Sequence, residues 1–224
     1  MRKIGIVVAD EGELFPLTQK IKNKETCNFF NREGYTAVIN NCRVYIFLCG
    51  IGKVNAAACT MYLKSLGCEI VLNYGYSGGI SGVKKGDVVV SDRFLEHDFD
   101  LVCLGYKPCE KPAQEYIYSA DRLLTDILCR LCPQAKVGLA VSGDRFVSDD
   151  ALRCTLKNDF GAMSCDMETA AIASVCHQTG MRFACLRQIS DDAGDDASSS
   201  YKSEANSGNI IPADVIISLI ENLD

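Results

Sequence analysis

The sequence predicts a single α/β domain in which a mixed central β-sheet is covered by helices on both sides. Short apolar runs rich in β-branched residues alternate along the chain with segments of helical spacing. Several of these runs are apolar on both faces, as in a sheet buried between helices. No internal repeat and no linker divides the 224 residues, of which 48% are hydrophobic. We therefore expect one domain over residues 1–224.

The apolar periodicity predicts where the elements lie. Strands are predicted at residues 3–8, 29–39, 43–49, 69–73, 88–91, 136–142 and 182–189. Helices are predicted at residues 14–21, 54–66, 123–131, 167–178 and 210–223. The predicted strand at residues 69–73 leads into the glycine-rich residues 75–79. Residues 98–118, with two prolines, and the acidic, serine-rich residues 191–207 are predicted to be irregular.

Charge and hydropathy exclude several classes of protein. The net charge is -6, and no run of lysine and arginine supplies a basic surface that could bind nucleic acid. No stretch approaches the roughly 18 apolar residues that a membrane span requires. The apolar run at residues 4–8 is too short for a signal peptide, and acidic residues follow it at once. We expect a cytoplasmic protein with a small-molecule ligand and without nucleic-acid or membrane partners.

The 13 cysteines are an odd number and are scattered through apolar surroundings. Cys129 and Cys132 form a close pair, but no second pair completes a zinc site. His97 and His177 are the two histidines of the chain. The pattern indicates buried thiols in a reducing compartment, and we expect neither a metal nor a cofactor.

Polar or glycine-rich segments follow the predicted strands, at the edge where ligands bind in open α/β sheets. Asp10 and Glu13 follow the first strand, where they either suit the positive end of a helix or orient and deprotonate water. Residues 50–53 form a tight turn into a helix and lack the spacing of a phosphate-binding P-loop. Residues 75–79 either form a plain turn or let the backbone approach a ligand closely.

Glu168 and Asp191 stand at two further strand ends. Glu168 is either an acid in the first turn of a helix or a ligand-binding carboxylate. Asp191 either caps the following loop or faces a shared pocket. Residues 142–146 follow another strand and bring Phe146 to the same rim. Carboxylates at neighbouring strand ends make a shared pocket geometrically natural.

Six segments in chain order resemble the bacterial 5′-methylthioadenosine/S-adenosylhomocysteine nucleosidases of the nucleoside phosphorylase superfamily. They are KIGIVVADEGE, GIGKVNAA, SGGI with KKGDVVVSD, VSGDRF, DMETAAIASVCH and RQISDDA. The resemblance implies hydrolysis of the N-glycosidic bond of a 5′-modified adenosine, such as 5′-methylthioadenosine or S-adenosylhomocysteine. The products would be adenine and the free 5′-modified ribose, which implies a place in purine metabolism and methionine salvage.

The resemblance also implies roles for single residues. Glu13 stands where the family holds the carboxylate that activates water, and Asp191 where it holds the acid that protonates adenine N7. Glu168 matches the residue that binds the ribose hydroxyls, with Met167 beside the sugar. Glu13 and Asp191 would act from opposite faces, as in inverting glycoside hydrolysis. Asp191 must then stay protonated near neutral pH, which needs burial or a raised pKa.

Other matched positions support these groups. Ser190 and Arg187 match neighbours that support the acid and the site, and Phe146 and Val147 match residues that enclose the purine. Tyr201 matches an aromatic residue on a lid over the 5′-substituent pocket. The remaining positions are Ile51 in the substrate site and Leu101, Leu104 and Tyr106, whose segment completes the partner subunit's pocket in the family's homodimer.

Three positions depart from the family pattern. Tyr76 replaces a small hydroxyl residue, Asp10 replaces an apolar residue near the 5′ side of the substrate, and Asp166 replaces a glutamate. Tyr76 and Asp10 are expected in the substrate site. Their presence leaves the preferred 5′ substituent open.

Two alternative functions remain. A phosphate-dependent purine nucleoside phosphorylase needs arginines at its phosphate site, whereas this chain has Asn73 on the strand before the glycine-rich segment. Carboxylates around such a site would also repel the anion. A catalytically inactive nucleoside-binding protein has no need of the three carboxylates, yet Glu13, Glu168 and Asp191 are all present.

Overall fold

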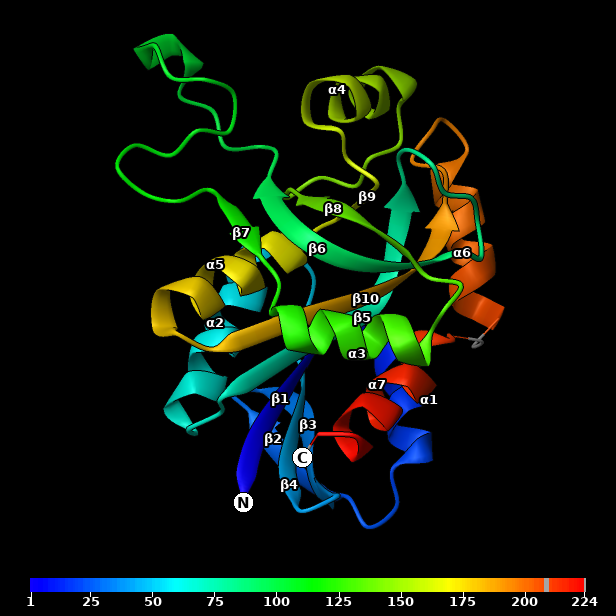
Figure 1. Ribbon diagram of the computed structural model, residues 1–224. Helices are drawn as coiled ribbons and strands as arrows, with labels where there is room; N and C mark the ends of the chain where they lie inside the picture. The colour runs from blue at the N-terminus through cyan, green and yellow to red at the C-terminus, as the bar shows by residue number, and fades with distance from the viewer. Residues whose placement is uncertain (208–209, 224) are drawn as a thin grey trace.

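The computed structural model describes residues 1–207 and 210–223 (Figure 1). Within these ranges, strands form one mixed ten-stranded sheet with helices on both faces, so the predicted fold class is confirmed. The strands are β1 (Arg2–Val8), β2 (Glu25–Phe29), β3 (Arg32–Ile39), β4 (Cys42–Leu48), β5 (Ile70–Gly79), β6 (Val88–Glu96), β7 (Ile117–Ser119), β8 (Lys136–Ser142), β9 (Ser164–Asp166) and β10 (Arg182–Asp191). The helices are α1 (Glu11–Lys20), α2 (Lys53–Ser65), α3 (Arg122–Leu131), α4 (Asp150–Phe160), α5 (Thr169–Thr179), α6 (Ala197–Ser207) and α7 (Pro212–Glu221), with a 3-10 turn η1 (Val102–Leu104).

Strand β5 is shared by two halves of the sheet. On one side it pairs with β1, and the sheet continues through β4, β3 and β2. On the other side β10, β6, β8 and β9 lead back to β5, so that these strands close on themselves. β1, β5 and β10 are parallel, and their carboxyl ends therefore meet at one edge. β9 joins that edge, since Cys165 pairs with Gly78.

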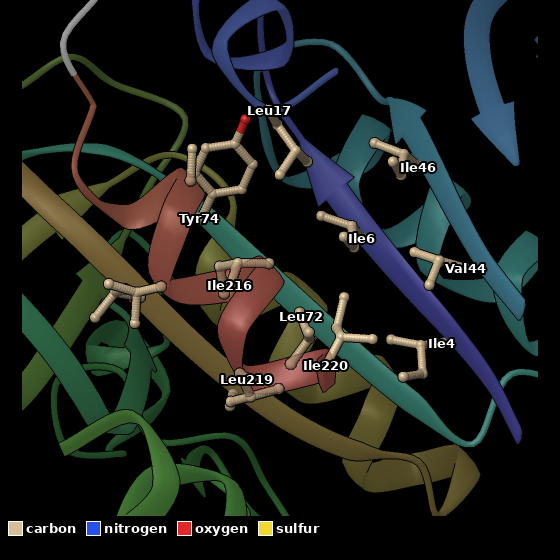
Figure 2. Packing of buried hydrophobic residues seen from close by; sticks show 14 of the residues in the cluster. Ile4, Ile6, Leu17, Val44, Ile46, Leu72, Tyr74, Ile216, Leu219 and Ile220 are labelled. Atoms are coloured by element: carbon tan, nitrogen blue, oxygen red, sulfur yellow. The ribbon is translucent and has the colours of Figure 1, made fainter. Parts of the chain in front are cut away.

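Helices bury both faces of the sheet. α1, α3 and α7 contribute to the core on one face, and α2 and α5 to the core on the other. Figure 2 shows the first core, in which Ile216 and Ile220 of α7 pack with Ile6 and Leu72 of the parallel strands. Double coverage explains why these strands are apolar on both faces. None of the helices in residues 1–207 and 210–223 has the length and apolar character of a membrane span.

The glycine-rich segment is part of β5, so residues 75–79 do not form the plain turn that was one of the two interpretations of this segment. The strand continues to Gly79 with its residues buried or nearly so. Glycine is needed here for space rather than for a turn: a Cβ on Gly75 would lie 2.2 Å from Glu13 Oε1. A Cβ on Gly78 would lie 2.9 Å from Cys165 Sγ. Glycine within a strand marks this kind of close approach.

The sequence analysis did not predict two of the helices, α4 and α6. α4 begins after Asp149, whose carboxylate accepts a hydrogen bond from the Leu152 N–H at 2.8 Å. Leu156 is the buried residue of α4, so the helix lacks a broad apolar stripe. α6 lies within residues 191–207, which were predicted to be a loop, and its serine-rich sequence carries equally little apolar signal. Short, mostly polar helices of this kind are held by their surroundings rather than by their own pattern.

The N-terminal third contains two smaller differences. Residues 29–39 were predicted as one strand, but β2 ends at Phe29 and a φ of 50° at Phe30 opens a turn into β3. Helix α1 starts at Glu11, earlier than predicted, because Asp10 Oδ1 accepts a hydrogen bond from the Glu13 N–H at 3.0 Å. Glu13 therefore lies in the first turn of a helix and not in a loop.

Candidate active site

A cavity of about 130 Å³ opens at the edge where β1, β5 and β10 end. Its wall contains most of the predicted site residues, namely Asp10, Glu13, Ile51, Tyr76, Phe146, Val147, Met167, Glu168, Ser190, Asp191 and Tyr201. The other wall residues, which the sequence analysis did not name as substrate-site residues, are Ala9, Ser77, Gly78, Arg145, Cys165 and Asp166. Arg187 is buried behind the wall.

Two backbone N–H groups, one in β5 and one just after β1, hold the carboxylate of Glu13. Oε1 accepts a hydrogen bond from the Tyr76 N–H at 2.7 Å. Oε2 accepts one from the Ala9 N–H at 3.3 Å, just after β1. The residue is 3% exposed. This side chain therefore has a fixed position at the cavity, although it comes from a helix.

Glu168 is held by the turn that precedes α2. Its Oε1 accepts a hydrogen bond from the Gly52 N–H at 2.9 Å, and its Oε2 accepts one from the Met167 N–H at 3.3 Å. Gly52 has a φ of 101°, a conformation that glycine adopts without strain. The glycine-rich turn at residues 50–53 thus positions a carboxylate of the protein.

Asp191 ends β10 and is 2% exposed. Its Oδ2 accepts a hydrogen bond from the Ser190 hydroxyl at 2.7 Å, and its Oδ1 accepts one from the Ala193 N–H at 2.8 Å. Both neighbours are close in sequence, so the strand end and the bend after it help to orient this carboxyl group.

Arg187 lies 1% exposed beneath the cavity, among several carboxylates. Its Nη1 is 3.8 Å from Glu13 Oε1, and its Nη2 is 3.8 Å from Glu168 Oε2 and 3.5 Å from Asp166 Oδ2. Its hydrogen bonds go to uncharged groups, from Nη1 to the Tyr76 carbonyl at 3.3 Å and from Nη2 to Thr169 Oγ1 at 2.8 Å. The guanidinium therefore acts on the carboxylates through charge rather than through direct bidentate pairing.

Asp166 is a site residue that the sequence analysis named only as a departure. Its Oδ1 accepts hydrogen bonds from the Ser142 hydroxyl at 2.6 Å, the Glu168 N–H at 3.0 Å and the Thr169 N–H at 2.9 Å. It thus fixes the start of α5 and the backbone of Glu168. The signal available in the sequence was two acidic residues separated by one position at a strand end.

Burial raises the pKa of each catalytic candidate. The pKa of Glu13 rises to about 8 because burial outweighs the opposing charge of Arg187. Burial likewise raises the pKa of Glu168 against the same cation. Burial raises the pKa of Asp191, and the hydrogen bonds from Ser190 and Ala193 oppose that rise. Burial therefore shifts all three carboxyl groups toward the protonated form.

Three aromatic residues, Tyr76, Phe146 and Tyr201, form part of the cavity wall. The Tyr201 ring of α6 meets the Tyr76 ring edge-on with centroids 6.3 Å apart, and it meets the Phe146 ring with centroids 5.8 Å apart. The Tyr201 hydroxyl donates a hydrogen bond to Asp10 Oδ2 at 2.8 Å. Val147 is buried, whereas Phe146 is 40% exposed. Tyr76 points into the fold and is 6% exposed.

Leu101, Leu104 and Tyr106 do not line the cavity of their own chain. They lie on the segment between β6 and β7, which reaches away from the sheet in Figure 1. Leu104 is 68% exposed and Tyr106 is 37% exposed. Within residues 1–207 and 210–223, no cluster of three or more His, Cys, Asp or Glu side chains has the arrangement of a metal site.

Comparisons of the sequence and of the fold identify relatives of this chain. Residues 3–220 match the family model described as the phosphorylase superfamily. The 5′-methylthioadenosine/S-adenosylhomocysteine nucleosidase of Halalkalibacterium halodurans is 33% identical, over 100% of both chains. The nucleosidase of the same name from a Geobacillus species is 34% identical, over 99% of both chains. The chain belongs to this nucleosidase family of the phosphorylase superfamily.

Solved structures of family members superpose on the whole chain. The Neisseria meningitidis nucleosidase in complex with methylthio-immucillin-A has a TM-score of 0.92 at 29% identity and covers 100% of both chains. The Streptococcus pyogenes S-adenosylhomocysteine nucleosidase in complex with 5-methylthiotubericidin has a TM-score of 0.91 at 29% identity. The latter comparison covers 100% of this chain and 98% of the other. The two family structures therefore share the fold of this chain.

The raised pKa of Glu13 predicts how stability depends on pH. The unfolded chain loses this proton near pH 4.5, whereas the folded chain keeps it to about pH 8. The folded state binds more protons between these values, so the free energy of unfolding falls as the pH rises through that window, by at most about 1.4 kcal/mol per pH unit for one proton. Urea denaturation at a series of pH values should show this fall in the wild type and a flatter profile in Glu13→Gln.

The matched control is Glu11→Gln, which removes an exposed carboxylate from the same helical turn. Its profile should follow the wild type. Parallel profiles for Glu13→Gln and the wild type would contradict the assignment of a raised pKa to Glu13.

Proposed function

We propose that this protein hydrolyses the N-glycosidic bond of a 5′-modified adenosine, such as 5′-methylthioadenosine or S-adenosylhomocysteine, to adenine and the free 5′-modified ribose. The observation that carries the proposal is the convergence of three buried carboxyl groups, Glu13, Glu168 and Asp191, on one cavity. Relatives that are named for this activity share the full length of the chain.

Asp191 has the chemistry of the general acid. Cleavage of the bond between C1′ and N9 leaves a purine that departs poorly as an anion, and a proton on N7 makes it a neutral leaving group. Burial raises the pKa of Asp191, which favours the protonated form that this transfer requires. Phe146 and Val147, which also line the cavity, supply apolar surface for the purine.

Glu168 suits a positioning role. Its carboxylate is already held by the Gly52 and Met167 N–H groups, so little entropy is lost when it accepts the two ribose hydroxyls. Met167 lies beside it in the cavity wall. The sugar is then fixed with C1′ presented to the remaining carboxyl group.

Glu13 has the chemistry of the base that activates water. With a pKa of about 8, Glu13 carries a proton in the free protein at neutral pH, and it must lose this proton before it can accept one from water. Positive charge develops on the sugar in the oxocarbenium-like transition state, and this charge favours the ionised form of a carboxyl group beside it. Glu13 and Asp191 come from different elements, α1 and β10, which suits action on opposite sides of the bond.

Phosphate is disfavoured as the nucleophile. Asn73 donates its amide hydrogen to the Val7 carbonyl at 2.9 Å, so that amide is already engaged within the sheet. Arg145 borders the cavity, but its guanidinium pairs with Asp149 at 2.8 Å. An anion in the cavity would meet several carboxyl groups. The inactive-binder alternative has no specific support, because the three carboxyl groups are present and positioned.

We further propose a homodimer in the cytoplasm. The exposed apolar side chains of Leu104 and Tyr106, together with Leu101, suit contact with a second copy, where they would complete the partner's 5′-substituent pocket. Val54, 79% exposed at the start of α2, adds apolar surface. The 13 cysteines are free thiols, which suits a reducing compartment.

Phosphate-independent release of adenine tests the reaction. Purified protein incubated with 5′-methylthioadenosine should release adenine and free methylthioribose at the same rate with and without phosphate. Chromatography of the base and the sugar measures both products. A requirement for phosphate, or a sugar 1-phosphate as product, would contradict hydrolysis.

Replacement of Asp191 by asparagine tests the acid. Asp191→Asn keeps the shape of the side chain but cannot transfer the same proton, so kcat should fall roughly 10²-fold or more. The dissociation constant for the nucleoside should change less than kcat. Asp192→Asn, one residue along and exposed, is the matched control and should keep wild-type kcat. Near-normal turnover of Asp191→Asn would remove Asp191 from the mechanism.

A further inference from the structure

The two parts of the cavity wall that the proposed reaction uses for the nucleoside come from separate segments of the chain. Phe146 and Val147, on the purine side, follow β8, whereas Glu168, on the ribose side, precedes α5. Glu168 is held in turn by the Gly52 N–H at the start of α2. A nucleoside contacts both sides productively only if the spacing between residues 144–147 and Gly52 is fixed.

Asp144 joins these two segments directly. Its Oδ1 accepts a hydrogen bond from the Lys53 N–H, next to Gly52, at 2.8 Å. A Cβ on Gly52 would lie 3.1 Å from the same oxygen, so a side chain there would crowd this contact. Helix α2 has no acidic residue in its first turn and no side-chain cap from its N-cap residue. Asp144 therefore supplies the cap and the negative charge that the start of a helix favours.

Asp98, two residues beyond β6, holds Asp144 in this position. Its Oδ2 accepts a hydrogen bond from the Asp144 N–H at 2.9 Å, and its Oδ1 accepts one from Lys53 Nζ at 2.5 Å. Lys53 Nζ also donates to Glu96 Oε2 at 3.2 Å. Lys53 is thus joined to the Asp144 segment twice, directly through its backbone N–H and through its side chain by way of Asp98.

Both Lys53 and Asp98 are charged at neutral pH. Burial raises the pKa of Asp98, but the hydrogen bonds from Lys53 and from the Asp144 N–H outweigh it, so the pKa is lowered overall. Burial lowers the pKa of Lys53, but its bonds to Asp98 and Glu96 outweigh that effect and raise the pKa overall. The two side chains are 17% and 30% exposed, so water screens their attraction only in part.

We propose that Lys53 and Asp98 form a positioning pair that holds residues 144–147, on the purine side of the cavity, at a fixed spacing from Glu168, on the ribose side. The inference rests on the function proposed above, since it needs a ligand that contacts both sides. Neither residue lines the cavity, so the pair acts through the groups that it holds. Fixed spacing lets the two halves of the nucleoside bind as one ligand and presents C1′ to Glu13.

The test compares a ligand that contacts both sides of the cavity with one that contacts only the purine side. The kcat/KM for 5′-methylthioadenosine and the dissociation constant for adenine are measured in the wild type, Lys53→Met and Asp98→Asn. Lys53→Met removes the charge but keeps the backbone N–H that donates to Asp144. Each variant should lose roughly tenfold in kcat/KM, the low end for a hydrogen bond to a charged group because the pair is partly exposed. The dissociation constant for adenine should change less than about twofold, because adenine does not bridge the two sides.

Two further variants separate the pair from a general effect of charge. The double variant Lys53→Met/Asp98→Asn should lose no more kcat/KM than either single variant, because the two residues act as one unit. Lys64→Met is the matched control. It removes an exposed lysine charge near the other end of α2, where Nζ donates to the Thr179 carbonyl, and it should keep the wild-type values.

Wild-type kcat/KM in both single variants, or losses that multiply in the double variant, would overturn the pair. Equal weakening of adenine and of the nucleoside would overturn the spacing role, because the pair would then act on the purine side alone. If the wild type binds both ligands but cleaves the nucleoside only with phosphate, the hydrolase function fails, and the dissociation constants of the two ligands test the pair in the same way. A wild type that binds neither ligand would overturn both proposals.

Discussion

Arg187 is enclosed in the sheet at 1% exposure, with the carboxyl groups of Glu13, Asp166 and Glu168 around its guanidinium. One buried cation cannot neutralise three buried carboxylates, and unpaired charge in the interior is costly. Burial raises the pKa values of Glu13 and Glu168, Arg187 opposes that rise, and the neighbouring carboxylates add to it. The same constraint supplies groups that exchange protons near neutral pH.

The strand arrangement makes room for this cluster. Arg187 of β10 lies opposite Gly75 of β5 in the parallel ladder. A Cβ at Gly75 would come within 2.5 Å of Arg187 Nη1, so the missing side chain is what admits the guanidinium. Because β1 and β5 end at the same edge, their backbone N–H groups also reach Glu13. The arrangement of β1, β5 and β10 thus fixes both the position of the Glu13 carboxylate and the position of the Arg187 charge beside it.

The sequence predicts what local patterns determine. Buried strands such as β1 and β10 carry continuous apolar runs, and carboxyl groups at their ends stand out. The path of β5 through residues 75–79 was missed because glycine usually marks a turn. Here the glycine at position 75 leaves the space that the Glu13 carboxylate occupies. α6 was missed because its residues are mostly polar. The bond between Tyr201 and Asp10 joins residues 191 positions apart, and no local pattern reports such a pairing.

The central claim is that burial, opposed by Arg187, sets the ionisation of Glu13. A carbon-13 NMR titration of the glutamate carboxyl groups, with Glu13 assigned by its Glu13→Gln variant, measures this directly. We expect a midpoint of about pH 8 in the wild type and a higher midpoint in Arg187→Met, which removes the cation that lowers the pKa. A midpoint near the ordinary value of 4.5 in the wild type, or a lower midpoint in Arg187→Met, would contradict the account.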